Sequence, residues 1–531
     1  MVHIRKMGVR IGLAIYRAVV AFLLVVTRPI FHWLYEDKRN KKLPPITNPL
    51  ILKSAVELAR MIRNKEVSCT EVVDAFIDRI KEVDNLLNAL VVNRFNEAKR
   101  DAAEVDRILA AGTLKEEYSE KNKPFLGVPF TAKEAFGIKG FPNTSGLMTS
   151  KNKEAQVDAD VITKLRQAGA IPLGLTNCSE LCMWYESSNL LYGRTNNAYH
   201  MGRMVGGSSG GEACIQSYGG SPIGVGSDIG GSIRMPAFFN GIYGHKPTTG
   251  IVSNEGQYPC AKGQAQTFLS TGPLCKRFED LTSLFKVMAG PDDVAKLKLD
   301  QKVDLKKVKF YYVLDDQNLM ARPVDGQIKN SILKAVHHLE TEVGATVKHA
   351  FLDKMKLSFF LWSAKMATGG NDPFSHWMGG TTGSPVNPFK ELLYWMVGRP
   401  RHTLPAIGLG IGEKLMDDPA TNERLVKLCD KLKEEILELL GDDGVLLYPT
   451  HPVPAPYHNQ AIILMANFCY TGIFNVLGLP VTNIPTGICK EGVPIGFQIV
   501  SSPLNDHLTI AVAGELDKVF GGWIPPCEVH C

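Results

Sequence analysis

The sequence predicts an α/β fold in which helices cover a largely parallel central sheet. Three segments, residues 160–177, 331–352 and 432–449, each run from a helical pattern through a glycine into a strand-like apolar run. Such alternation is typical of parallel sheets, because a helix carries the chain back before the next strand begins. A capping box made by Ser68 and Glu71 opens a further helix, whose apolar residues recur at helical spacing.

The charge of the chain is concentrated at its N-terminus. Of the formal net charge of +5, the first 42 residues contribute nine Lys or Arg against two acidic residues, so the remainder carries a small negative charge. A basic face for nucleic acid is therefore not predicted. Because no clean domain boundary follows, we expect an N-terminal segment, residues 1–42, and one folded unit, residues 43–531.

Eleven cysteines, an odd number without dense spacing, predict free thiols in a reducing compartment. Cys178 and Cys182 have no second pair at the spacing of a zinc site. The terminal CEVHC, residues 527–531, offers only half of a metal site. We therefore predict no metal and no cofactor.

Residues 11–27 are apolar except for Arg17, and their number is near the shortest that spans a bilayer. No small-residue cleavage site follows, which argues against a signal peptide. On a helix, Lys6, Arg10, Arg17 and Arg28 fall within about 40° of one another. The segment is predicted to bind a membrane, either in the headgroup plane or spanning with Arg17 at a cost of about 2.5–3.5 kcal/mol. A core helix of a soluble enzyme is the alternative.

Residues 351–416 differ from the rest, because they combine three of the six tryptophans with Gly- and Pro-rich breaks. One interpretation is an inserted helical layer that buries its own aromatic side chains. The other is an apolar substrate channel or a membrane-facing cap. The sequence leaves both open.

The candidate chemistry lies in the stretch GVGSDIGGSIRMP, residues 224–236, where a strand-like run ends in a Gly-Gly-Ser turn at Ser232. The turn lacks the Gly-Lys-Ser/Thr ending of a phosphate loop and the third glycine of a dinucleotide fingerprint. A second turn, residues 204–214, satisfies Gly-x-Ser-x-Gly at Ser208 and at Ser209, which would suit an α/β-hydrolase esterase.

That esterase interpretation needs an acid and a histidine downstream. The sequence offers Asp442 or Asp443 with His451 or His458, but the interpretation leaves the Gly-Gly-Ser turn unexplained.

An interpretation that uses both turns makes Ser232 the nucleophile and Ser208 its partner. The base is then a lysine, which acts only when neutral, a state that an apolar pocket promotes. Lys133, directly after an apolar strand, is the candidate.

The two Gly/Ser motifs 24 residues apart, with an upstream G-V-P-x-x-x-K, resemble the amidase signature family. The resemblance covers most of the chain after about Ser54 and is carried further by LGVPFTAKEAF, AGAIPLGLTN and GVPIGFQIV. It implies the amidase-signature fold, a mixed central sheet between helices. It also implies a serine–serine–lysine triad on Ser232, Ser208 and Lys133.

The same resemblance implies an oxyanion hole and a supporting set of residues. The oxyanion hole comprises the backbone N–H groups of Ile229, Gly230, Gly231 and Ser232, and the supporting residues are Ser209, Asp228 and Arg234. Within the family, TNCSELCMWYESSNLLYGRTNN, GGSSGGE and GSIRMPAFFNG are similar to the fatty-acid amide hydrolase branch, in its vertebrate type-2 form.

That branch implies a membrane-bound serine hydrolase that cleaves primary fatty-acid amides and N-acylethanolamines through an acyl-enzyme. It implies an intracellular membrane, such as the endoplasmic reticulum or a lipid droplet, and no nucleic-acid partner. The oligomeric state stays open, a homodimer included. The alternative within the family is the A-type component of glutaminyl-tRNA amidotransferase, which acts in a complex and has no need of residues 11–27.

Overall fold

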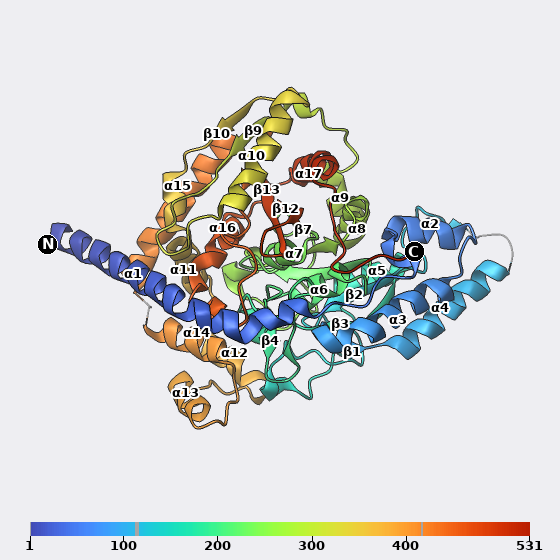
Figure 1. The fold of residues 1–531 in the computed structure, drawn as a ribbon, viewed down its shortest axis with the longest axis horizontal. Helices are drawn as coiled ribbons and strands as arrows, with labels where there is room; N and C mark the ends of the chain where they lie inside the picture. The colour runs from blue at the N-terminus through green and yellow to red at the C-terminus, as the bar shows by residue number, and fades with distance from the viewer. Residues whose placement is uncertain (1, 112–115, 416–417) are drawn as a thin grey trace.

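The computed structural model of the protein describes residues 2–111, 116–415 and 418–531 (Figure 1). Two residues at the limits of predicted segments, Met1 of segment 1–42 and Met416 of segment 351–416, are not among the described residues. Within the described residues, eleven strands form one sheet in the order β1-β3-β2-β6-β8-β7-β12-β13-β11-β9-β10. These strands are β1 Leu90–Asn93, β2 Pro129–Lys133, β3 Ile171–Thr176, β6 Ile223–Asp228, β7 Tyr243–Lys246, β8 Ser270–Cys275, β9 Lys309–Tyr312, β10 Val347–His349, β11 Gly444–Tyr448, β12 Val481–Ile488 and β13 Pro494–Ser501. A separate hairpin pairs β4 Ser188–Asn189 with β5 Gly193–Arg194.

Helices account for most of the remaining regular structure. They are α1 Val2–Tyr35, α2 Ala55–Arg63, α3 Cys69–Leu87, α4 Phe95–Ala110, α5 Asp160–Gln167, α6 Gly210–Ser217, α7 Arg234–Asn240, α8 Glu279–Ala289, α9 Pro291–Leu297, α10 Gly326–Thr341, α11 Ser358–Thr368, α12 Phe374–Gly379, α13 Pro388–Met396, α14 Leu404–Leu415, α15 Pro419–Leu440, α16 Cys469–Leu477 and α17 Asp506–Phe520. The predicted capping box at the start of α3 is confirmed, because the Ser68 and Glu71 side chains each bond the other's backbone N–H.

The sheet is mixed, so the expectation of a largely parallel sheet is wrong and the mixed sheet implied by the family is confirmed. The three helix–glycine–strand segments do supply β3, β10 and β11, and each of these has a parallel neighbour. The centre of the sheet, β8, β7, β12 and β13, is antiparallel. A short turn of residues 489–493 joins β12 to β13, and such a turn permits only an antiparallel pair.

Both faces of the sheet are covered. In β11, Val445 and Leu447 belong to one apolar cluster, whereas Leu446 and Tyr448 belong to another. Successive side chains of a strand point to opposite faces, so a hydrophobic core lies on each side. The helices around the sheet in Figure 1 supply the other walls of these two cores.

Helix α1 lies outside these cores. It is the one helix among the described residues that is long and apolar enough to cross a membrane. In Figure 1 it runs along one side of the molecule, with its N-terminal end projecting beyond the body. Phe22, Val25 and Trp33 are each more than 60% exposed, so the alternative of a soluble core helix does not fit the structure.

Candidate active site

Lys133 is the last residue of β2, and β2 lies parallel to β6 in the sheet. Polar groups at the carboxyl ends of parallel strands gather at one edge, which is where α/β proteins commonly bind ligands. The Lys133 side chain is completely buried. Its Nζ donates to Ser208 Oγ at 2.7 Å and to Ser227 Oγ, on β6, at 3.0 Å.

The two Gly/Ser turns are held against each other. Ser209 N donates to the carbonyl oxygen of Ser232 at 3.1 Å. The Ser209 hydroxyl also lies between the turns and the sheet, because its oxygen is 3.4 Å from Ser227 N and 3.3 Å from Ser227 O. Each turn is followed by a buried helix, α6 after Ser209 and α7 after Ser232. The structure therefore brings Lys133, Ser208 and the Ser232 turn into one constellation.

Gly231 is the residue of the turn that has to be glycine. Its φ is +119°, and a Cβ there would lie 2.0 Å from Thr471 Oγ1. The Gly231 N–H donates to Asp228 Oδ1 at 2.6 Å. The Gly231 amide, one of the four predicted oxyanion donors, is therefore already used to anchor the turn. The other three predicted donors, the amides of Ile229, Gly230 and Ser232, do not take part in this bond.

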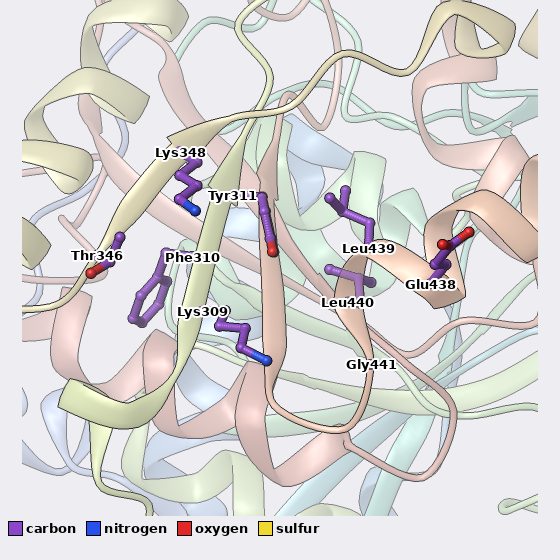
Figure 2. Close-up of a pocket in the computed structure, with 9 residues that line it drawn as sticks. All are labelled: Lys309, Phe310, Tyr311, Thr346, Lys348, Glu438, Leu439, Leu440 and Gly441. Carbon is purple, nitrogen blue, oxygen red and sulfur yellow. The ribbon is translucent and has the colours of Figure 1, made fainter.

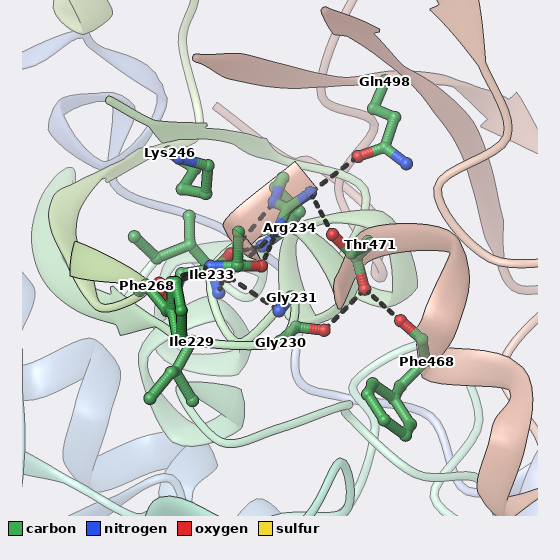
Figure 3. A network of polar contacts seen from close by, with 12 residues as sticks. Ile229, Gly230, Gly231, Ile233, Arg234, Lys246, Phe268, Phe468, Thr471 and Gln498 are labelled. Atoms are coloured by element: carbon green, nitrogen blue, oxygen red, sulfur yellow. Dashed lines mark hydrogen bonds and ion pairs between the residues drawn. The ribbon is translucent and has the colours of Figure 1, made fainter. Parts of the chain in front are cut away.

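A buried ion pair holds the turn from behind (Figure 3). Arg234 contacts both carboxylate oxygens of Asp228 at 3.0 Å and also donates to the Thr471 carbonyl and the side chains of Gln498 and Asn475. Burial alone would raise the pKa of Asp228, but the Arg234 charge and its hydrogen bonds lower it to about 2. The carboxylate is thus ionised at neutral pH and positions three successive parts of the turn, at Gly231, Ile233 and Arg234.

We expect Asp228→Asn to lower the free energy of unfolding by about 3–5 kcal/mol, because the change leaves the buried Arg234 charge without its partner. Urea denaturation at pH 7 measures this. Since the folded pKa of Asp228 is below its ordinary value of 3.8, its stabilisation is complete above that pH and is lost as the pH falls towards about 2. Glu104→Gln, which breaks the exposed pair with Arg107, is the control and should change nothing measurable. Equal midpoints for the two variants would contradict the role of the pair.

Several residues around the turn carry no role in the sequence-based prediction. They are Ser227, Trp362, Phe468, Thr471, Asn475 and Gln498. Thr471 Oγ1 lies 2.8 Å from the carbonyl oxygens of Gly230 and Phe468 (Figure 3). Thr471 and Asn475 are four residues apart on α16 and so share one helix face, a spacing visible in the sequence. Ser227 stands in the quoted motif, but only the pairing of β2 with β6 brings it to Lys133.

The aromatic-rich segment reaches the same turn. Trp362, on α11, donates its indole N–H to the Ile229 carbonyl at 3.0 Å. Its ring packs edge-on against that of Phe468, with 4.7 Å between the ring centroids. A Cβ at Gly230 would lie 3.5 Å from each of these two rings. An apolar wall therefore stands directly in front of the Gly-Gly-Ser turn.

The rest of this segment divides between the two interpretations. Met378 and Ile407 form a small buried cluster with Leu147 and Leu181 of the body, as an inserted layer would. By contrast, α13 carries exposed apolar side chains, Leu393 and Met396 among them.

The two histidines that the esterase alternative requires, His451 and His458, form hydrogen bonds with other parts of the chain and not with the two turns. His451 Nδ1 donates to the Val453 carbonyl at 2.7 Å, and burial lowers the pKa of this ring to about 4. His458 is bonded through Nδ1 to Glu186 and through Nε2 to the Met201 carbonyl. Neither ring is bonded to a serine of the two turns, so the structure does not support the esterase alternative.

A cavity of about 410 Å³ opens at the other end of the sheet, by the strand edge of β9 and β10 and the end of α15 (Figure 2). Lys309, Tyr311, Lys348 and Glu438 are among its lining residues. None of the residues predicted to be catalytic lines it. This cavity is therefore not part of the candidate site at Ser232.

Comparison with known proteins identifies the class. Residues 71–510 match the family described as Amidase, and the protein is thus an amide-hydrolysing enzyme. The chain belongs to this family, as the two Gly/Ser turns and the upstream lysine motif predicted.

The relatives of the chain differ in their sequence identity to it. The chain is 49% identical to fatty-acid amide hydrolase 2 of Homo sapiens over 525 residues, which cover 97% of this chain and 98% of that protein. It is 28% identical to the A-type component of the glutamyl-tRNA(Gln) amidotransferase of Marinomonas sp. (strain MWYL1), over 88% of this chain and 96% of the relative. A solved structure described as fatty acid amide hydrolase superimposes with a TM-score of 0.73 at 22% identity, over 95% of this chain and 91% of that one, which shows the shared fold.

Proposed function

We propose that this enzyme hydrolyses fatty-acid amides, both primary fatty amides and N-acylethanolamines, to a fatty acid and an amine or ammonia at a membrane surface. The substrate class rests on the 49% identity with a fatty-acid amide hydrolase over nearly the whole of both chains, against 28% for the amidotransferase component. The wall of Trp362 and Phe468 beside Gly230 supports an apolar acyl group there.

The observation that carries the mechanism is the contact between Lys133 Nζ and Ser208 Oγ in the turn that is bonded to Ser232. We propose that Ser232 Oγ attacks the amide carbonyl while its proton passes through Ser208 to the neutral amine of Lys133. The oxyanion that forms accepts hydrogen bonds from the amides of Ile229, Gly230 and Ser232, each worth roughly 2.7–4 kcal/mol in comparable sites.

The proton on Lys133 is then needed a second time. An amine leaves only when it is protonated, so the proton returns through Ser208 to the nitrogen of the collapsing intermediate. A water molecule, deprotonated by the same route, hydrolyses the acyl-enzyme and releases the fatty acid. Ser227, the other partner of Lys133, holds Nζ in place through both steps.

A chain-length series tests the substrate class. Primary amides from acetamide to an eighteen-carbon amide keep the headgroup constant, so kcat/KM reports burial of the chain alone. Each buried methylene is worth about 0.8 kcal/mol, or roughly fourfold, and we expect kcat/KM to rise with length until the apolar wall is covered. A flat profile, or activity on the glutamine amide that exceeds that on long-chain amides, would contradict the proposal.

Trp362→Ala is expected to lower kcat/KM for the long-chain amide by at least tenfold and to leave that for acetamide within about threefold, because a short acyl group does not reach the removed ring. Trp377→Ala is the matched control, since its indole N–H is bonded to Asp372 within its own segment. An equal loss on both substrates would assign Trp362 to the turn geometry and not to the acyl group.

We also propose that α1 binds the membrane in the headgroup plane and does not span it. Arg17, in the middle of the apolar stretch, donates to the carbonyl oxygens of Asn318 and Leu319 at 2.6 and 3.0 Å. A helix that crossed the bilayer upright would carry these body residues into the hydrocarbon core. An in-plane helix keeps them out and directs the exposed Phe22 and Val25 towards lipid.

We expect Phe22→Asp with Val25→Asp to reduce partitioning into vesicles of phosphatidylcholine and phosphatidylserine by at least tenfold per substitution, because each removes an apolar side chain from lipid. Sedimentation with the vesicles measures this partitioning.

The control is Val157→Asp with Leu333→Asp, which changes two apolar side chains exposed elsewhere on the body and should leave vesicle binding normal. Complete retention of the native protein after alkaline carbonate washing would favour a spanning helix, and an entirely soluble native protein would refute membrane binding.

A further inference from the structure

A buried carboxyl group joins the elements that carry the proposed base and its serine partner. Glu212 lies on α6, the helix that begins directly after Ser209, and its side chain is completely buried. Thr131 Oγ1, on β2, donates to Glu212 Oε1 at 2.6 Å, and Thr176 Oγ1, at the end of β3, donates to Glu212 Oε2 at 2.9 Å. Gln216, one turn later on α6, donates to Oε1 at 3.0 Å. The carboxyl group therefore connects one helix with two strands of the sheet.

The two threonines lie beside Lys133 in the sheet. Thr131 stands two residues before Lys133 on β2, so their side chains point to the same face. Thr176 is the partner of Lys133 in the parallel pairing of β2 with β3. Since Glu212 binds both threonines, this is the face that α6 covers. On the same face Lys133 reaches Ser208, in the turn that leads into α6.

Two glycines of β6 make room for this packing. Gly224 is the partner of Thr131 in the pairing of β2 with β6. A Cβ at Gly224 would overlap with Glu212 Oε1. A Cβ at Gly226 would lie 3.0 Å from Ser209 Oγ. Glycine inside a strand is typical of a close approach by another part of the chain. The Gly-Val-Gly run before the Gly-Gly-Ser turn thus lets α6 lie directly against the sheet.

The carboxyl group fits its place with or without its proton. The groups that donate to it are two hydroxyls and an amide, none of which carries a charge. Burial raises the pKa of Glu212 to about 7, although the three hydrogen bonds oppose the rise. A proton on Oε2 is donated to the Thr176 hydroxyl, whose own hydrogen then turns to the Ala132 carbonyl 3.3 Å away. The connection therefore needs hydrogen bonds and not a charge.

We propose that Glu212 is a positioning residue for the amidase reaction, which joins α6 to β2 and β3 and so keeps Ser208 Oγ and Lys133 Nζ at the distance over which the proton passes. The proposal rests on the proton route of the proposed function. Each of the two groups stands on or next to an element that Glu212 holds, because Lys133 ends β2 and Ser208 lies two residues before α6. Side chains that support a catalytic pair from behind set its geometry, and a displacement of about 1 Å costs up to a hundredfold in rate.

Amide and ester substrates report the alignment of this pair differently. With an amide the proton route acts on the nucleophile and again on the leaving nitrogen, whereas an ester with an acidic phenol as leaving group needs only the first transfer. Misalignment therefore lowers the ratio of kcat/KM for a para-nitroanilide to kcat/KM for the para-nitrophenyl ester of the same acyl group. A loss of folded enzyme lowers both values by the same factor and leaves this ratio unchanged.

The experiment measures this ratio for the full-length enzyme and its variants, with octanoyl and with acetyl substrates. Glu212→Ala should lower the ratio at least tenfold, with KM within about threefold of native. Glu212→Gln should keep the ratio within about twofold, because its amide accepts from Thr131 and donates to Thr176 as the protonated acid does. Thr131→Val removes one of the three hydrogen bonds, should lower the ratio at least fourfold, and decides the question if Glu212→Ala does not fold.

Two further variants calibrate the ratio. Thr509→Val is the matched control, since the Thr509 hydroxyl is equally buried but donates to the Asp506 carbonyl within α17, and its ratio should be native. Lys133→Met removes the base itself and should lower the ratio at least as much as Glu212→Ala does.

The proposal is overturned if folded Glu212→Ala keeps the native ratio, if Glu212→Gln loses as much as Glu212→Ala, or, where Glu212→Ala does not fold, if Thr131→Val keeps the native ratio. An unchanged ratio in Lys133→Met would overturn the proton route and this proposal with it. A lowered ratio in Lys133→Met beside a native ratio in Glu212→Ala overturns only the role of Glu212. Because the acetyl substrates read the same ratio, an error in the fatty-acyl substrate class is distinguishable from an error here.

Discussion

Ser232→Ala is expected to lower kcat/KM by about 10⁴-fold or more, because removal of a nucleophile leaves only the contribution of binding and of the oxyanion donors. The fold should persist, since the backbone of the turn is held by Asp228 and by Ser209, not by the Ser232 hydroxyl. A fluorophosphonate probe, followed by digestion and mass spectrometry, identifies the reacting residue. We expect the label on Ser232 in the native enzyme and none in the variant.

The control is Ser217→Ala. Ser217 is also buried, but its hydroxyl donates to the Cys214 carbonyl within α6 and has no contact with either turn. This variant should be labelled at the native rate. Label on Ser208 or Ser209 in the native enzyme would overturn the assignment of Ser232 and favour the esterase interpretation of the upstream turn.

The sequence contains enough to predict candidate residues for the site but not the residues that contact them. The Gly-Gly-Ser turn and Lys133 are visible because each comes at the end of a strand-like run, and the Gly-Ser-Ser-Gly turn is visible because its glycines and serines match a known motif. Their contacts with Trp362, Thr471 and Ser227 are not visible, because residues more than 90 positions apart meet only through the order of strands or the packing of helices. Hydrophobic periodicity predicts that a strand exists and says nothing about its neighbour.

The same limit explains the error about the sheet. Helix–strand alternation correctly placed β3, β10 and β11. However, β7 and β8 are joined by a largely irregular segment, residues 247–269, and β12 pairs with β7 only after the helices and strands that lie between them in the sequence. For α1, composition alone left spanning and in-plane binding open. The structure adds that Arg17, whose charge looked like the cost of insertion, is bonded to the carbonyl groups of Asn318 and Leu319, and our proposal of in-plane binding rests on this contact.

Lys133→Met is expected to lower kcat/KM by about 10²–10⁴-fold, the range that a positioned general base supplies. Methionine keeps most of the volume of the lysine side chain, so the loss reports the missing amine and not a cavity. The rate of fluorophosphonate labelling at Ser232 should fall in parallel, because the base is needed before any leaving group is protonated. Lys133→Ala, which does leave a space, should be partly rescued by millimolar concentrations of a small primary amine.

A second buried lysine makes the matched control. Lys276 is as completely buried as Lys133, but its amine donates to the Ile51 carbonyl and has no hydrogen bond to either turn. Lys276→Met should therefore affect stability and leave kcat/KM within about threefold. If Lys276→Met lost activity as Lys133→Met does, the effect would belong to buried lysines in general. If His451→Gln were as inactive as Lys133→Met, a histidine would be the base, and the contact between Lys133 and Ser208 would serve the fold alone.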